Sequence, residues 1–330
     1  MFTRLEFSRI MNNTRQAGED QGHILRHCFI QPGAIATHMT RSSDSISPTA
    51  HYTGYTWFHH GLSHPALVTP QGRLLHAALR PMHALARATG APTLSAFLLA
   101  RHRLIDLFLS RAIDEGRISQ VIEVAAGLSP RGWRFKQRYG APLRYIEADL
   151  PDMAQRKLTL LTQAGLMQPE HEAVPLDALA DTGPLSLAAL SASLDQTRGT
   201  AIITEGLLNY FDTPTVQGMW ARFARALQPF PHGLYLSDIH LTHGNQGAGA
   251  SGFKALLSTF VKGRVHLHFA GDDEAAQTLL QAGFAQARLH APRDFSTELG
   301  PLQPGANVVR VIEALTRPAV PLHHPATGTR

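Results

Sequence analysis

The chain has 330 residues, of which 44% are hydrophobic and 17% are charged, and its mean hydropathy is −0.10. This balance supplies enough apolar surface for a large core and excludes an intrinsically disordered polypeptide. The 30 basic and 25 acidic residues give a net charge of +5. The arginines are scattered rather than clustered, so we expect no nucleic-acid partner. No run of apolar residues is long enough to span a bilayer, so we also expect no membrane partner.

The cysteine and histidine content limits the possible metal chemistry. The single cysteine, Cys28, excludes an intrachain disulfide and a zinc site built on thiolates. None of the 19 histidines has the spacing that places two ligands and a base on one helix face, so we expect no metal site. The low cysteine content is typical of a reducing compartment, and the first 45 residues contain no secretory signal. We therefore predict a cytoplasmic protein.

The two ends of the chain differ from its body. Residues 1–45 are polar and have no sustained hydrophobic period, which predicts a disordered tail. An alternative is that the natural chain starts at Met39. Residues 317–330, rich in proline, predict a C-terminal tail. Between these ends we expect an N-terminal strap with helices over 46–116 and one cofactor-binding catalytic domain over 117–316.

The predicted elements begin with two helices, over 72–90 and 93–115, which have apolar residues at helical spacing. From residue 119 onward, strands and helices alternate. The predicted strands are 121–126, 143–148, 171–176, 199–204, 233–239, 287–290 and 307–314. The predicted helices between them are 130–138, 151–164, 184–194, 213–227 and 272–282. This alternation predicts a doubly wound, mostly parallel, Rossmann-like α/β sheet. The last strand is expected to be antiparallel, because no evident helix precedes it.

Small and acidic residues follow the first two predicted strands. In an open α/β sheet the ligand lies beyond the carboxyl ends of the strands, where the strand order reverses. Ala125 and Gly127 end the first strand and let a ligand approach the backbone closely. Asp149 ends the second strand, where a carboxylate can accept both hydroxyl protons of a ribose. The alternative for Asp149 is an N-cap of the following helix.

The glycine pattern disfavours a dinucleotide. A G-x-G-x-x-G motif would need glycines at three positions where this chain has Ala125, Gly127 and Pro130. Pro130 also lacks the backbone donor that a pyrophosphate would use. Glu123, inside the first predicted strand, suits a ligand that carries an ammonium group and no phosphate, such as S-adenosylmethionine. The alternative for Glu123 is that it orders the loop instead of touching a ligand.

Four segments resemble, in the same order, the motifs of the leucine carboxyl methyltransferase and TcmP-like polyketide O-methyltransferase family. They are Arg101–Asp106, Glu123–Phe135, Tyr145–Pro151 and Thr204–Phe211. The resemblance implies a class I methyltransferase that uses S-adenosylmethionine. The chain departs from the family pattern where it has Ala125 in place of a glycine and Ser129 in place of an aspartate.

Carried over by position, the family's cofactor contacts fall at the ends of the predicted strands and in the helix before them. The resemblance implies the following contacts: Arg101, with Arg103 as the alternative, for the methionine carboxylate; Ala125 and Gly127 along the cofactor; Asp149 for the ribose; Leu176 or Asp177 for the adenine; and Glu205 near the methionine portion. Glu205 ends an apolar strand, so its carboxylate requires a cationic ligand or a nearby arginine.

Candidate general bases follow the fourth and fifth predicted strands. They are Tyr210, Asp238 and His240, which a hydroxyl acceptor would use and a carboxylate acceptor would not need. Their alternative roles are a cavity wall, a turn residue and a surface histidine, respectively. The aromatic segment 51–57 predicts either an acceptor lid or a packed strap. The segment 241–262 is expected to form a mobile cap over the acceptor.

The sequence therefore favours O-methylation of a small-molecule hydroxyl or carboxylate. Three alternatives are open. In the first, the acceptor is the C-terminal carboxylate of a partner protein. In the second, the chain is a non-catalytic module that retains cofactor binding. In the third, it is an NAD-linked enzyme.

Overall fold

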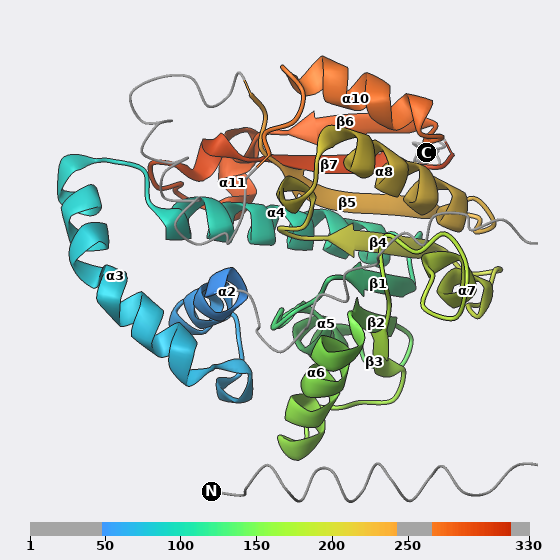
Figure 1. The fold of residues 1–330 in the computed structure, drawn as a ribbon, viewed down its shortest axis with the longest axis horizontal. Helices are drawn as coiled ribbons and strands as arrows, with labels where there is room; N and C mark the ends of the chain where they lie inside the picture. The colour runs from blue at the N-terminus through green and yellow to red at the C-terminus, as the bar shows by residue number, and fades with distance from the viewer. Residues whose placement is uncertain (1–47, 243–265, 318–330) are drawn as a thin grey trace, which may run out of the picture. The chain divides into compact units, whose positions relative to one another are not determined.

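The computed structural model describes residues 48–242 and 266–317. The two predicted tails and the predicted cap therefore lie almost entirely outside the described residues. The described chain forms a seven-stranded sheet with helices on both faces (Figure 1).

Most of the sheet is parallel. The parallel strands at one side are β1 (Gln120–Val124), β2 (Arg144–Asp149), β3 (His171–Pro175), β4 (Thr200–Thr204) and β5 (Gly233–Ile239). The remaining strands are β6 (Gln286–His290) and β7 (Arg310–Leu315). The strand order is β3-β2-β1-β4-β5-β7-β6, and β7 is antiparallel to both of its neighbours. The predicted sheet with an antiparallel last strand is thus confirmed. The strand order reverses between β1 and β4, which is where a ligand is expected.

Two apolar cores cover the two faces of the sheet. Successive side chains of a strand point to opposite faces, so a strand covered on both sides is apolar at nearly every position. In β1, Ile122 packs in the core that contains Trp220 of α8 (Thr213–Leu227), whereas Val121 packs in the core that contains Leu104 of α4 (Leu94–Asp114). The other helices of this part are α5 (Arg131–Tyr139), α6 (Pro151–Gln163), α7 (Leu187–Ala192) and α10 (Asp272–Gln281).

The helix starts follow from local capping. The side chain of Thr93 accepts a hydrogen bond from the N–H of Ala96 (3.2 Å) where α4 begins, and Asp212 caps α8 through the N–H of Thr215 (3.0 Å). Each cap satisfies a backbone donor that has no partner inside the helix. The predicted helix over 213–227 has the bounds of α8, and most other predicted elements agree within a few residues.

Two elements differ from the sequence predictions. Residues 51–57 belong to helix α2 (Pro48–His59), and the helix α3 (Pro70–Thr89) packs on it. The buried residues of α2 include Tyr52, Thr56 and Trp57, a helical spacing that its aromatic and β-branched residues obscured. The connection to the last strand also contains the short helices η4 (Pro292–Phe295) and α11 (Ser296–Leu299).

A cluster of tyrosine and histidine rings joins α2 to α3. The ring centroids of Tyr55 and His59 each lie 4.8 Å from that of His76, and the ring of His83 lies 6.2 Å from it. Burial, together with the neighbouring histidines and Arg80, lowers the pKa of His76 to about 4. The cluster is therefore assembled with His76 neutral.

Acid is expected to weaken this contact. The pKa of His76 in the folded state lies below the ordinary value of about 6.5, so the unfolded state binds the proton more strongly between about pH 6.5 and 4. Stability is complete above this window and falls as the pH drops through it. Thermal unfolding between about pH 7.5 and 4.5 should show a fall in Tm that the variant His76→Asn reduces. An equal fall in that variant would assign the pH effect to other groups.

Candidate active site

The predicted ligand site forms where β1 and β2 end. Beyond β1 the chain turns through Ala125 and Gly127, whose φ angles are 55° and 48°. The carboxylate of Asp149, at the end of β2, accepts hydrogen bonds from the N–H groups of Gly127 (2.7 Å) and Leu150 (2.8 Å). The structure thus joins the two strand ends that the sequence singled out.

The contacts of Asp149 leave room for a ligand. Two N–H donors occupy two of about four acceptor positions on a carboxylate. Burial raises the pKa of Asp149, and the N–H donors and Lys157 oppose that rise. Asp149 does not cap the following helix, because α6 starts after Leu150 without a side-chain cap. A half-buried carboxylate with unused acceptor positions is a group that can accept hydrogen bonds from ligand hydroxyls.

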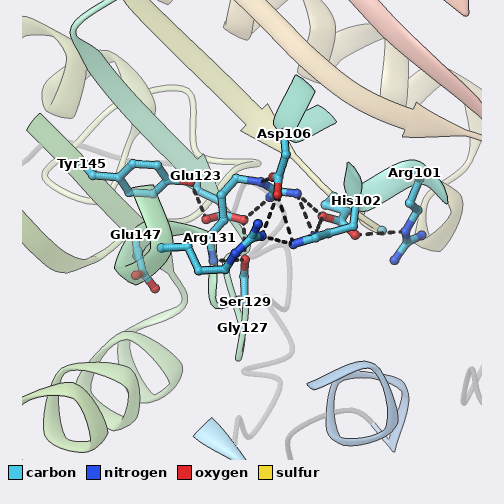
Figure 2. Close-up of polar contacts among 12 residues, drawn as sticks. Arg101, His102, Asp106, Glu123, Gly127, Ser129, Arg131, Tyr145 and Glu147 are labelled. Carbon is cyan, nitrogen blue, oxygen red and sulfur yellow. Dashed lines mark hydrogen bonds and ion pairs between the residues drawn. The ribbon is translucent and has the colours of Figure 1, made fainter. Parts of the chain in front are cut away.

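A buried ionic cluster, centred on Arg131, lies beside this loop (Figure 2). The fully buried guanidinium of Arg131 donates to Asp106 of α4 (2.6 Å), to Glu123 of β1 (2.5 Å) and to Glu205, which follows β4. His102 of α4 also contacts Glu205, with Nδ1 2.8 Å from Oε2. We call this group, together with Arg101, Arg134 and Asp238, the Arg131 cluster.

Arg101 connects the cluster to β5. Its Nε lies 3.1 Å from Glu205 and its Nη1 lies 2.7 Å from Asp238. Its third nitrogen, Nη2, has no hydrogen-bond partner within the described residues, and a Cβ on Gly206 would lie only 2.9 Å from it. The alternative residue, Arg103, is exposed on α4. Arg101 is therefore the arginine that presents a nitrogen at this edge of the sheet.

Glu205 has the cationic neighbours that its position requires. Burial alone would raise the pKa of Glu205, but the charges of His102, Arg131 and Arg101 outweigh burial and hold that pKa well below its usual range. The carboxylate is thus ionised and fully paired within the protein.

Glu123 is occupied by protein contacts. Its carboxylate, on a residue only 1% exposed, accepts hydrogen bonds from Ser129 Oγ (2.7 Å) and Tyr145 Oη (2.8 Å) as well as from Arg131. These contacts favour the interpretation that Glu123 orders the loop. Ser129, where the resembled family has an aspartate, supplies one of them.

A second buried charge group holds the loop from α6. Lys157 Nζ donates to the carbonyl oxygens of Gly127 (3.2 Å) and Ser129 (2.6 Å) and pairs with Glu147 of β2. Glu147 also lies 2.8 Å from His171 Nε2. The charges of Lys157 and His171 outweigh burial and lower the pKa of Glu147. The loop is thereby fixed by Asp149 on one side and Lys157 on the other.

The predicted adenine contacts follow β3. The N–H of the buried Leu176 donates to the carbonyl oxygen of Asp149 (2.7 Å), and Asp177 Oδ1 accepts from the N–H of Leu179 (2.9 Å). Both residues therefore lie at the same edge of the sheet as Asp149.

The three candidate bases have different surroundings. Both oxygens of Asp238 are used, one by Arg101 and one by the N–H of Gly206 (2.6 Å). His240 is buried, not on the surface, and its Nδ1 lies 3.1 Å from the carbonyl oxygen of Val308. Burial lowers the pKa of His240 despite the opposing effect of Asp238. Tyr210, in the short helix η2 (Leu208–Tyr210), is 38% exposed.

The sequence predictions missed His102, Asp106, Arg131 and Lys157. A signal was present in α4, where Arg101, His102 and Asp106 interrupt an apolar helix and are all buried. Polar residues on the inner face of a helix require partners. The sequence does not show which segment supplies those partners.

Comparisons with solved structures agree with this architecture. A DUF574 family protein from Streptomyces avermitilis aligns with a TM-score of 0.54 at 17% identity, and a protein from Thermobifida fusca titled a putative methyltransferase aligns with a TM-score of 0.56 at 13% identity. Each alignment covers 82% of this chain and 96% of the other. At these identities the likeness concerns the fold, which is of the class I methyltransferase type.

Residues 64–224 match the family model described as leucine carboxyl methyltransferase. This match confirms the resemblance that the motifs predicted, and it covers just under half of the chain. Curated relatives include proteins of Mycobacterium avium, 35% identical over 141 residues, and of Mycobacterium bovis, 36% identical over 124 residues. Both are named "Putative S-adenosyl-L-methionine-dependent methyltransferase". The alignments cover 42% and 37% of this chain and 43% and 38% of those relatives, so the matches span about two fifths of each.

Replacing Ala125 by glycine should stabilise the protein. Ala125 adopts a left-handed backbone conformation, which costs an alanine about 1–2 kcal/mol and a glycine very little. The more flexible unfolded state offsets part of this gain, so we expect Ala125→Gly to raise the free energy of unfolding by about 0.5–1 kcal/mol. Denaturant unfolding measures the change. Ala126→Gly, next in the chain and without a positive φ, is the matched control and should destabilise. A loss of stability in Ala125→Gly would contradict the interpretation.

The pair formed by Glu147 and Lys157 should behave as a buried ion pair. Lys157→Met leaves the Glu147 carboxylate buried without its main cation, which should cost about 3–5 kcal/mol of unfolding free energy. The double variant Glu147→Gln with Lys157→Met removes both charges and should recover most of that loss. Denaturant unfolding of the single and double variants tests this. A double variant as unstable as the single one would instead show that the bonds from Lys157 to the loop carbonyls dominate.

Proposed function

We propose that this chain is an S-adenosylmethionine-dependent methyltransferase that methylates an oxygen of a small molecule, either a hydroxyl or a carboxylate. The family match and the fold support the reaction class. The main observation behind the proposal is the hydrogen bond between Asp149 and Gly127. It holds a carboxylate that can accept hydrogen bonds from hydroxyl groups beside a loop of small residues, at the place where the strand order of the sheet reverses.

The residues at this edge fit the cofactor. Asp149 has unused acceptor positions for ribose hydroxyls, and Arg101 Nη2 is a donor for the methionine carboxylate. Asp177 and Leu176, which follow β3 at the same edge of the sheet, are the residues proposed to flank the adenine. Glu123, in contrast, is occupied within the protein and has no evident ligand role.

The charges of the Arg131 cluster are paired within the protein. Three arginines and His102 contact the carboxylates of Asp106, Glu123, Glu205 and Asp238. When bound, S-adenosylmethionine would supply a methyl group attached to a positively charged sulfur. The rest of the cofactor would then leave as a neutral thioether.

The protein's own contribution is to position the acceptor and to accept a proton. Alignment of acceptor and methyl donor can supply about 7–11 kcal/mol in favourable cases. The Nδ1–H of His240 donates to the Val308 carbonyl, which leaves the basic lone pair of the neutral ring on Nε2. The lowered pKa of His240 keeps the ring neutral at neutral pH. His240 is thus the best-prepared base for a hydroxyl acceptor, since both oxygens of Asp238 are already used.

Calorimetry with S-adenosylmethionine tests the proposal through Asp149. Asp149→Ala removes a half-buried acceptor and should weaken S-adenosylmethionine binding by about 1–3 kcal/mol, whereas Asp152→Ala, at an exposed acid at the start of α6, should leave the affinity unchanged. Equal affinity in the two variants would remove Asp149 from the site, and binding of NAD in place of S-adenosylmethionine would overturn the cofactor assignment.

A radiolabelled methyl donor added to cell extract identifies the acceptor class. We expect the label in the small-molecule fraction, with transfer reduced in Asp149→Ala. Label on protein would favour a protein carboxyl methyltransferase. Binding of S-adenosylmethionine without transfer to either fraction would favour a non-catalytic module.

A further inference from the structure

Exposed apolar side chains are concentrated on α3. Of the seven large hydrophobic residues that are exposed in the described part of the chain, three lie on this helix: Leu74 (71% exposed), Met82 (40%) and Leu85 (66%). The other four are spread over different elements. Scattered single residues are ordinary on a protein surface, but a contiguous patch indicates an interaction site.

The exposed residues form one continuous side of the helix. We call the following eight exposed, uncharged residues the apolar face of α3: Leu74, Ala77, Ala78, Pro81, Met82, Ala84, Leu85 and Ala88. At about 100° per residue they lie within a sector of about 160°. The opposite side, which includes Leu75, His76, Leu79 and His83, is buried or half-buried and faces α2 and the neighbouring core.

A basic edge borders this face. Arg73 and Arg80 are both exposed and lie on the same side of the helix, about two turns apart. The twenty residues of α3 contain no aspartate or glutamate. The helix therefore combines a wide apolar face with positive charge only, which is the pattern of a helix that lies on an anionic surface.

A second copy of the chain is a poor occupant of this face. If two α3 helices pair in an antiparallel two-fold arrangement, the arginine edges of both copies lie on the same side of the pair and repel each other. A 20-residue helix is about 30 Å long, and one face of it is small beside the roughly 800 Å² per partner of a standard protein interface. The same shortage of area applies to a folded acidic partner protein.

We propose that the apolar face of α3 docks on an anionic lipid membrane, with Leu74, Met82 and Leu85 in the boundary between headgroups and acyl chains and Arg73 and Arg80 at the lipid phosphates. Leu74 and Leu85 are eleven positions apart with alanines between them, and lipid chains adapt to such separated side chains whereas a protein surface has a fixed shape. Within the described residues no helix is long and apolar enough to cross a membrane. The proposed contact lies on the membrane surface. It departs from the expectation of no membrane partner, which was based only on the lack of a spanning segment in the sequence.

Co-sedimentation with sucrose-loaded vesicles tests this proposal without relying on methyl transfer. The full chain should bind vesicles of phosphatidylcholine with one third phosphatidylglycerol and bind pure phosphatidylcholine weakly. The double variant Leu74→Gln with Leu85→Gln should lower the partition coefficient at least tenfold. The matched control, Leu179→Gln with Leu280→Gln, changes two exposed leucines on other elements and should bind like the wild type. Arg73→Gln with Arg80→Gln should remove the preference for the anionic vesicles.

Other outcomes would overturn the proposal. These are absence of vesicle binding by the wild-type chain, or equal binding by Leu74→Gln with Leu85→Gln in a variant whose circular dichroism matches the wild type. A wild-type dimer, detected by light scattering, that becomes a monomer in the same variant would assign the face to a second copy. Salt-sensitive binding to an acidic protein, with no vesicle binding, would assign it to a protein partner.

Discussion

The buried guanidinium of Arg131 is the group on which the geometry of the candidate site depends. It ties α4 to β1 and to the end of β4 through Asp106, Glu123 and Glu205. A buried charge costs several kcal/mol in desolvation, which only close and well-oriented opposite charges offset. The elements that carry these acids are therefore fixed relative to one another, because displacing any one of them would leave a buried charge unpaired.

The loop after β1 is also held in a fixed conformation by hydrogen bonds, one of which comes from the Arg131 cluster. Its Ser129 bonds to Glu123 of the Arg131 cluster, and Asp149 and Lys157 hold Gly127 through its N–H and its carbonyl oxygen. A loop bound at so many points is a prepared surface for a ligand rather than one that must be ordered on binding. This explains why a residue as strained as Ala125 is tolerated there, since the surrounding bonds determine its conformation.

The fold was largely predictable because its signals are local. Continuous apolar runs indicated the buried strands, apolar residues at helical spacing indicated α3 and α8, and the order of the elements indicated the doubly wound sheet. The position of Asp149 opposite Gly127 was predictable for the same reason, because parallel strands end at one edge. Helix α2 was missed because its aromatic and β-branched residues carry no strong helical preference, and only its packing against α3 and α4 reveals the helical spacing.

The partners within the site were not predictable from the sequence. Glu123 was expected either to suit a ligand ammonium or to order the loop, and neither interpretation named Tyr145 and Arg131, which it meets from segments 22 and 8 residues away. Which charged side chains meet depends on where the helices cross the edge of the sheet. A hydrophobic pattern in the sequence does not specify the positions of those crossings to within the length of a side chain. Gly132 is a further example, because a Cβ there would lie 2.1 Å from Glu147 Oε1, a close approach that the sequence gives no sign of.

Arg101 links the proposed cofactor residues to the proposed base. It binds Glu205 after β4 and Asp238 in β5, and Asp238 lies two positions before His240. His240 follows directly after β5, which ends at Ile239, so the bond that holds Asp238 also holds the strand end that His240 follows. Since the Nη2 of Arg101 is the donor proposed for the methionine carboxylate, one side chain sets the position of the cofactor's charged end and of the base together. Under the proposed function, an acceptor would therefore lie between Arg101 Nη2 and His240, and the side chains around that space, not the Arg131 cluster, would select it.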